Sequence, residues 1–356
     1  MAAASSPATN GLVFQDQAAG VLTDVESTEI GIKHHCPQGS DCSHVDSLGS
    51  NDGEDDAGHA GSTKSLPEHA VQSVFENGRR YCNDTYSMPN DEIEQTRLSI
   101  LHQLYLLALD GHLTQIPLPE SPSRILDLGS GPGDWAIAIG EEYPEAEIIA
   151  TDISVFDAQS VSIAPPNVYF QIDDAEGKWT FHEPFDFIHV RGLARAIVDW
   201  PHLYQQAFDH LKPGGAIQIT DGNLSSTSSP PNSYLNIFIS ALHSAAEVAG
   251  YIPGFEHLRP SALAAAGFED IRTREIEVPI GTWPTDPKKK TMGKMALIVL
   301  LEGLEAMSMR LLTKYTGWKA EDVIDLCEKV KVEIVSSQGA FGTARVVVAR
   351  KPEPKG

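Results

Sequence analysis

Short apolar segments alternate with stretches of helical periodicity through the middle of this 356-residue chain. Arg124 to Gly129 (RILDLG) predicts a buried strand, because its apolar positions are nearly continuous and a glycine-rich turn follows. Helical patterns run from about Asp134 to Glu142 and from Tyr204 to Leu211. Further strands are expected at Ala146–Asp152, Val168–Asp173, Phe185–Val190 and Ala216–Thr220, with a last pair near Ile271–Val278 and Ala344–Ala349. The alternation predicts an α/β fold: a Rossmann-like, doubly wound, mostly parallel seven-stranded sheet with helices on both faces.

Two helical regions lie outside this pattern. Apolar spacing predicts a helix from Asp91 to Leu109, which Gly111 ends. An insertion rich in Met, Leu and Lys, Lys288 to Val330, separates the last two strands. Ligands of open α/β sheets bind outside the carboxyl ends of the strands, so this insertion is expected to cap the crevice. It would then line a hydrophobic pocket with Met292, Met295, Met307 and Met309, beside Trp283; the alternative is that these methionines fill an ordinary helical core.

The beginning of the chain has a different composition. Residues 1 to 70 contain eleven acidic residues, two basic residues and the single aromatic residue Phe14. Such a segment buries too little apolar surface to offset its ordering entropy, so residues 1–80 are predicted to be a disordered acidic tail. His34, His35, Cys36, Cys42 and His44 lie in this tail, but their spacing matches no usual structural zinc pattern, and no metal site is predicted.

The overall charge argues against several partners. The chain has 49 acidic and 26 basic residues, a formal net charge of -23, which repels a phosphate backbone; no nucleic acid is expected. The sequence has no run of 18 apolar residues and no signal-peptide pattern, so no membrane association is expected. Four scattered cysteines form no disulfide framework, which favours a cytoplasmic or nuclear location.

The turn after the first strand, DLGSGPGDW, holds Gly129, Gly131 and Gly133 at alternate positions. Glycine permits positive φ and lets a ligand lie directly against the backbone. The spacing differs from the dinucleotide fingerprint G-x-G-x-x-G. Asp134 stands at the start of the next helix, where an acid is suited to capping but repels a pyrophosphate. The turn therefore favours a cationic ligand such as S-adenosylmethionine (SAM) over a nicotinamide dinucleotide.

Carboxylates end the next two strands. Asp152 follows Gly129 by 23 residues, a position from which a carboxylate reaches the hydroxyls of a bound ribose. Asp173 and Asp174 end the third strand beside the same crevice, where one of them can accept a hydrogen bond from an adenine amino group. Two alternatives stay open: Asp152 as a helix cap or turn former, and the Asp173–Asp174 pair as turn formers.

Five blocks of the sequence resemble the fungal LaeA-like class I methyltransferases, and the resemblance runs from about Tyr81 to Pro352. The blocks are Tyr86–Glu92 (YSMPNDE), Ile125–Ala136 (ILDLGSGPGDWA), Ile172–Glu176 (IDDAE) with Trp179, Phe185–Arg191 (FDFIHVR) and Leu211–Gly215 (LKPGG). The resemblance implies a methyltransferase domain over residues 81–352. Within it, residues 81–120 would form a helical lid, 121–222 the SAM-binding core and 223–352 the substrate-side helices and last strands.

The same resemblance implies SAM as the methyl donor. Asp127, Gly129 and Gly131 would surround its methionine end, Asp152 its ribose and Asp174 its adenine, with the Tyr86–Glu92 block as a lid. In full, the residues expected to bind the cofactor are Tyr86, Asp127, Gly129, Ser130, Gly131, Gly133, Asp152, Ile153, Asp173, Asp174, Ala175 and Val190.

This chain departs from the family pattern in two places. The family usually reads Gly-Thr-Gly-Thr-Gly-Ile-Trp where this chain has Gly129-Ser-Gly-Pro-Gly-Asp-Trp135, so Pro132 stiffens the turn and Asp134 adds an acid. Near the C-terminus the family often carries His-Ala-Tyr where this chain has Gly339-Ala340-Phe341. A polar pair that could face the substrate is absent there, which argues against the same substrate chemistry as in the rest of the family.

Methyl transfer is an in-line displacement that a dry, well-aligned site accelerates, and a general base is optional. His189 or Arg191, just past the fourth strand, is the candidate to remove a proton from the acceptor or to hold an anion. A histidine bonded within the sheet edge is the alternative for His189, and His182 is a weaker candidate.

Two functions stay open on this basis. The first is methylation of a small-molecule acceptor in fungal secondary metabolism. The second is a LaeA-type regulatory methyltransferase that acts with nuclear partner proteins, for which the acidic tail would offer protein contacts. A dehydrogenase on the same fold is a distant third, because the glycine spacing is wrong for it.

Overall fold

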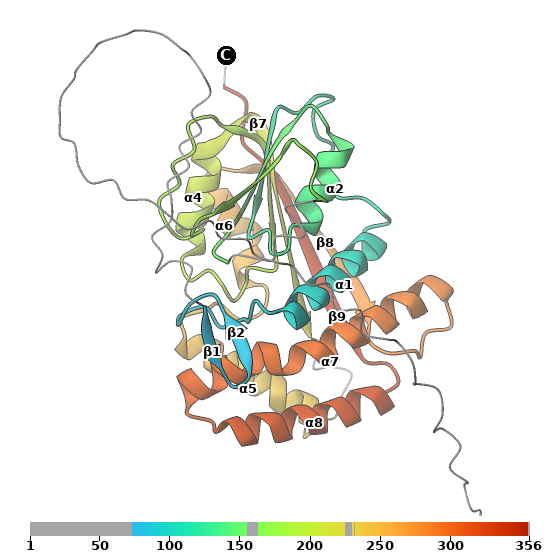
Figure 1. Ribbon diagram of the computed structural model, residues 1–356. Helices are drawn as coiled ribbons and strands as arrows, with labels where there is room; N and C mark the ends of the chain where they lie inside the picture. The colour runs from blue at the N-terminus through green and yellow to red at the C-terminus, as the bar shows by residue number, and fades with distance from the viewer. Residues whose placement is uncertain (1–72, 155–162, 225–229, 231, 355–356) are drawn as a thin grey trace, which may run out of the picture. The chain divides into compact units, whose positions relative to one another are not determined.

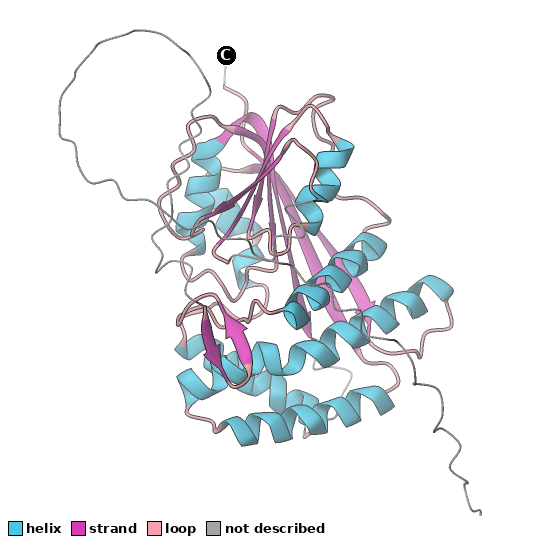
Figure 2. Ribbon diagram, viewed as in Figure 1, coloured by secondary structure: helices cyan, strands magenta, loops and turns pink. Residues whose placement is uncertain are grey.

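A seven-stranded sheet forms the centre of the part of the chain that the computed structural model describes, residues 73–154, 163–224, 230 and 232–354 (Figures 1 and 2). Its strand order is β5-β4-β3-β6-β7-β9-β8. Pairing is parallel from β5 through β7, whereas β9 runs antiparallel to both of its neighbours. The predicted fold class is therefore confirmed. The strands are β3 (Arg124–Leu128), β4 (Glu147–Asp152), β5 (Val168–Ile172), β6 (Phe185–Arg191), β7 (Leu211–Leu224), β8 (Glu269–Pro279) and β9 (Phe341–Arg350).

The strand order reverses between β3 and β6, and crevices for ligands form at such a switch point. Leu128 pairs with Val190 and Asp127 with His189 in this parallel register. The glycine turn after β3 and the loop after β6 therefore leave the sheet side by side, at its carboxyl edge.

Helices cover both faces of the sheet (Figure 1). Alternate strand residues such as Leu126 and Ile188 pack with α4 (Trp200–His210) and α6 (Pro260–Ala265) on one face. Their neighbours Ile125 and Phe187 pack with α2 (Asp134–Glu142) on the other face. Full burial of each of these large apolar side chains stabilises the fold by about 1.5–3 kcal/mol.

The remaining helices form a third cluster at one end of the sheet (Figure 1). They are α1 (Glu92–Ala108), α5 (Tyr234–Val248), α7 (Pro287–Thr316) and α8 (Ala320–Ser336), and a 3₁₀ turn, η2 (Glu256–Leu258), precedes α6. The predicted insertion is thus two helices, which Gly317 separates by ending α7 in the left-handed conformation, φ 71°. Asp91 caps α1 by accepting a hydrogen bond from the Glu94 amide.

A small antiparallel hairpin, β1 (Val74–Glu76) and β2 (Arg79–Tyr81), precedes α1. Its turn residues, Asn77 and Gly78, both have positive φ, as a type I′ turn requires. These residues fall inside the range assigned above to the tail, so the folded part begins earlier than residue 81. Residues 1–72, with the His/Cys cluster, lie outside the described part.

The buried guanidinium of Arg310 on α7 holds this hairpin and the chain after it. It lies 3.5 Å over the Tyr81 ring and donates to Glu76 at 2.8 Å. Its Nη1 also donates to the carbonyls of Asn83 and Tyr86. One side chain therefore ties α7 to the block that begins at Tyr86.

Candidate functional site

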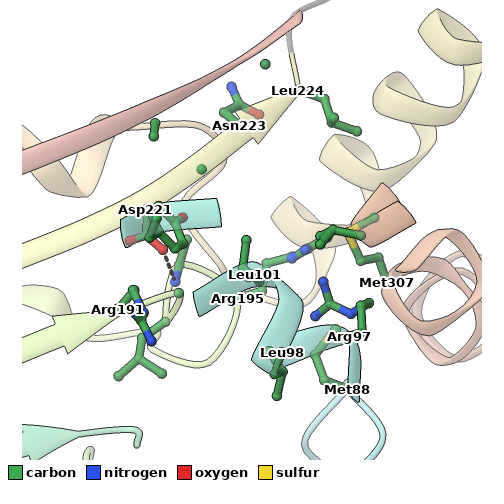
Figure 3. A pocket seen from close by; sticks show the side chains of 18 of the residues that line it. Met88, Arg97, Leu98, Leu101, Arg191, Arg195, Asp221, Asn223, Leu224 and Met307 are labelled. Atoms are coloured by element: carbon green, nitrogen blue, oxygen red, sulfur yellow. Dashed lines mark hydrogen bonds between the residues drawn. The ribbon is translucent and has the colours of Figure 1, made fainter. Parts of the chain in front are cut away.

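A cavity of about 350 Å³ opens at the carboxyl edge of the sheet, where β3, β6 and β7 meet helices α1, α5 and α7 (Figure 3). The glycine turn, Asp152 and the Tyr86 block line one part of it. The other part is mainly apolar, with Leu101, Leu104, Leu242, Ala246, Val299 and Leu300 among its lining residues. The cavity thus joins a polar region at the switch point to an apolar chamber among the helices.

The glycine turn is fixed by bonds to the second strand. The amides of Gly129 and Ser130 donate to the Thr151 carbonyl at 2.8 and 2.9 Å, and the Gly131 amide donates to Asp152 Oδ2 at 2.8 Å. Gly131 has φ 56°, and a Cβ there would meet only Leu98, at 3.7 Å, so its backbone faces open space. A ligand can therefore lie directly on this turn.

Asp152 lines the cavity and accepts two backbone hydrogen bonds, from Gly131 and from Ser154, each at 2.8 Å. Burial raises the pKa of its carboxyl to about 6, against the opposing effect of these two hydrogen bonds. The group is consequently ionised at neutral pH but titrates in a mildly acidic range.

Several charged residues of the cavity come from elements far apart in the sequence. On α1, Arg97 donates two hydrogen bonds to Glu94, at 2.6 and 2.8 Å. At the end of β7, Asp221 accepts from Nε2 of the fully buried His257 at 2.7 Å. Arg195, on the loop after β6, lies between Asp221 and Arg97 (Figure 3).

Arg191, at the end of β6, has a different environment. Its Nη2 lies 3.2 Å from Nδ1 of His102, and its guanidinium is 5.3 Å from the centre of the Tyr105 ring. Burial lowers the pKa of Arg191 and brings the pKa of His102 to about 3. His102 is therefore neutral and can accept the hydrogen bond from the guanidinium.

Comparison with known proteins gives a consistent result. Residues 100–269 match a family model described as a methyltransferase domain. "Methyltransferase pytC" of Aspergillus terreus is 34% identical over 305 residues, 82% of this chain and 92% of that protein. "Secondary metabolism regulator LAE1" of Cochliobolus heterostrophus is 35% identical over 304 residues, 81% of this chain and 98% of that protein. This chain belongs to the LaeA-like methyltransferase family. "Probable methyltransferase tdiE" of Emericella nidulans is a further relative, 31% identical over 301 residues, 81% of this chain and 92% of that protein.

Five of the twelve cofactor residues expected of this LaeA-like methyltransferase line the cavity together. They are Tyr86, Gly129, Ser130, Gly131 and Asp152, and Arg191, expected at the acceptor, joins them. Asp127 lies just beneath the turn: its Oδ1 is bonded, whereas its buried Oδ2 has no partner among the described residues. An unpartnered buried acceptor beside the turn suits a ligand with a hydrogen-bond donor, such as an amino group.

Other expected residues lie away from the cavity wall. Gly133, with φ 94°, faces the Phe170 ring, so its role is packing against β5. The Val190 side chain is in the core on the α4 face. Asp173 Oδ1 and Asp174 Oδ1 accept local backbone hydrogen bonds, as turn formers do. Contacts of Ile153, Asp173, Asp174 and Ala175 with the cofactor stay predictions.

His189, the other candidate expected at the acceptor, lies beneath the site and does not line the cavity. Its side chain is 2% exposed, stacks on Trp135 at 3.8 Å, and donates from Nδ1 to Asp127 Oδ1 at 2.8 Å. The reason is strand alternation: His189 pairs with Asp127 one residue before Val190, so both side chains point to the α2 face. His189 thus positions Asp127. His182, in the loop before β6, is likewise absent from the lining of this cavity.

The capping and pocket residues also differ in part from expectation. The N-cap of α2 is Gly133, and Asp134 accepts a hydrogen bond from Ser99 of α1 at 3.0 Å without capping the helix.

Of the four methionines of the insertion, Met307 alone lines the described cavity. Met292 and Met309 are buried in the helical core, and Trp283 donates to the carbonyls of Ile280 and Ala340.

Proposed function

We propose that this methyltransferase transfers the methyl group of SAM to a small, mostly apolar acceptor molecule of secondary metabolism. One observation carries the proposal: a single cavity extends from the glycine turn into the apolar chamber between α1, α5 and α7. Its small volume and its helical walls favour a small molecule over a macromolecular substrate. No helix of the described residues is long and apolar enough to cross a membrane.

Residues on the cavity wall and beside it suit the parts of SAM. The open backbone at Gly131 and the free Oδ2 of Asp127 suit its methionine end, with the amino group as donor. Asp152 suits the ribose hydroxyls, and Asp174 the adenine amino group. When bound, SAM supplies an electrophilic methyl group on a sulfonium. The protein holds this group in line with the acceptor and excludes water from the chamber.

An acceptor hydroxyl has to lose a proton during the transfer, and Asp221 is the best-placed group to take it. It lies near the carboxyl end of β7 on the cavity wall, 3% exposed, where His257 donates to its Oδ2. This hydrogen bond fixes the carboxylate in orientation. We assign this role to Asp221 in place of His189.

Calorimetry with purified full-length protein tests the cofactor assignment. S-adenosylhomocysteine (SAH) is expected to bind with a Kd in the micromolar range, and NADH to give no heat. NADH binding without any SAH heat contradicts the proposal.

A second candidate, a regulatory methyltransferase with nuclear partner proteins, is favoured by the relatives named as secondary metabolism regulators. The acidic tail would then carry the protein contacts. Comparing metabolites of cells with and without the gene separates the two functions. A 14-dalton difference confined to one pathway supports the metabolite enzyme, whereas broad change across many pathways supports regulation.

A further inference from the structure

Arg195 places a guanidinium at the junction between the cofactor region and the apolar chamber. It comes from the loop between β6 and α4, and Figure 3 shows it beside Leu101, between Asp221 and Arg97. Among the residues with assigned positions, none forms a hydrogen bond or an ion pair with this guanidinium. Its charge is therefore directed into the cavity without a protein partner.

The other charged side chains on the cavity wall each have a partner within the described ranges. Glu94 is bonded to Arg97, and Asp221 to His257. Asp152 accepts two amide hydrogen bonds, Asp134 accepts from Ser99, and Arg191 contacts His102. None of these acids forms a hydrogen bond or an ion pair with Arg195.

An enclosed cation without a partner is costly, because burial removes it from water. Burial indeed lowers the pKa of Arg195, and the positive charge of Arg97 acts in the same direction. A ligand anion would offset this cost. A guanidinium is suited to carboxylates, because its planar fork donates two parallel hydrogen bonds to the two oxygens.

The cofactor carries a carboxylate too, but Arg191 is better placed for it. Arg191 is the last residue of β6 and lies beside the glycine turn, and the acidic side chains that act on it are Asp127 and Asp134. The groups that act on Arg195 are Arg97 and Glu94 of α1, Asp221 of β7, and Tyr86. The two arginines therefore have different acidic neighbours, those of Arg191 at the glycine turn and those of Arg195 on α1 and β7.

We propose that the acceptor is an apolar molecule with a carboxylate, and that Arg195 binds this carboxylate. The inference rests on the proposed function, since the apolar chamber is taken as the acceptor site. Leu101, Leu242 and Leu300 would contact the apolar body of the acceptor.

Matched acid and amide probes test this assignment on the full-length protein. The pairs are 4-phenylbutanoate with 4-phenylbutanamide and indole-3-acetate with indole-3-acetamide. Each Kd is measured by calorimetry, once with saturating SAH and once without any nucleoside. The wild-type protein is expected to bind each acid at least roughly ten-fold more tightly than its amide.

The variants are Arg195→Met, Arg195→Lys and, as a matched control, Arg272→Met at an exposed arginine of β8 that pairs with Asp270. The preference for acids should vanish in Arg195→Met, persist in part in Arg195→Lys and stay at the wild-type value in Arg272→Met. Melting temperatures identify any variant that fails to fold, and Arg195→Lys then carries the test.

Three results overturn the inference. The first is a wild-type protein that binds the acids no more tightly than the amides, and the second is a preference for acids that survives in Arg195→Met. The third is an Arg195→Met variant that binds SAH weakly but binds 5′-methylthioadenosine as tightly as the wild type does. The last result assigns Arg195 to the cofactor carboxylate. If neither the wild type nor any variant binds SAH, the proposed function is contradicted but the assignment of Arg195 is not. The titrations without nucleoside still test whether Arg195 binds a carboxylate.

Discussion

Replacing Asp152 with asparagine tests whether this carboxylate binds the cofactor ribose in its ionised form. Its pKa is raised to about 6 by burial, so the cavity holds a carboxylate at pH 8 and increasingly a carboxylic acid below pH 6. Only the carboxylate can accept hydrogen bonds from both ribose hydroxyls while also accepting those of Gly131 and Ser154. Affinity for SAH should therefore fall as the pH falls.

The size of the effect follows from the titration. If the ionised form alone binds, the apparent Kd is the intrinsic value divided by the ionised fraction, so it rises about two-fold at pH 6 and about ten-fold at pH 5. Asp152→Asn cannot titrate. Its affinity at pH 8 should be roughly ten-fold lower than that of the wild type and should stay level from pH 8 to pH 5.

The raised pKa of Asp152 also determines how its contribution to the free energy of unfolding changes with pH. A raised pKa means that the folded protein binds this proton more readily than the unfolded chain between about pH 4 and pH 6. The contribution of Asp152 to the free energy of unfolding therefore declines as the pH rises through this window, and the decline is absent in Asp152→Asn.

Calorimetric titration of SAH at half-unit steps of pH, with melting curves at each step, measures both effects. A wild-type affinity that stays level from pH 8 to pH 5 refutes the reasoning. So does an Asp152→Asn variant with the wild-type slope, because another group would then be responsible for it.

Three further perturbations separate packing from ligand binding. Met309→Ala, at a core side chain that is 3% exposed, should lower the free energy of unfolding by about 2–5 kcal/mol. Met307→Ala, on the cavity wall, should chiefly change acceptor binding. Equal losses of stability in the two variants would contradict this division. Gly131→Ala should weaken SAH binding at least roughly ten-fold, whereas Gly78→Ala, also at positive φ in open space, should leave it unchanged; calorimetry decides. Deletion of residues 1–72 should leave the melting temperature and SAH affinity nearly unchanged, and loss of folding would show that the tail packs on the domain.

Local patterns were enough to predict the parallel part of the sheet. The apolar segment at Arg124, the alternating glycines and the carboxylate at Asp152 all encode their roles within a few residues. The Asn77-Gly78 pair is also typical of the hairpin turn that joins β1 and β2, although the acidic composition of the preceding residues indicated a disordered tail.

Features that depend on pairing between distant segments could not be predicted in this way. β7 continues to Leu224 because Gly222 and Asn223 pair with β9, although their sequence suggests a polar loop. His257 has no local pattern, and only the folded chain brings it to Asp221. The burial of His189 was readable in principle, because strand alternation places it on the same face as Asp127.

Met307 and Arg310 lie about one helical turn apart on α7. Met307 lines the cavity, and Arg310 donates to the carbonyl of Tyr86, a residue that also lines the cavity. An acceptor that shifts this turn would also shift Tyr86, so the two ligands should bind cooperatively, each changing the affinity of the other by the same factor. Arg310→Met is expected to bring that factor toward one, and SAH titrations with and without 4-phenylbutanoate measure it.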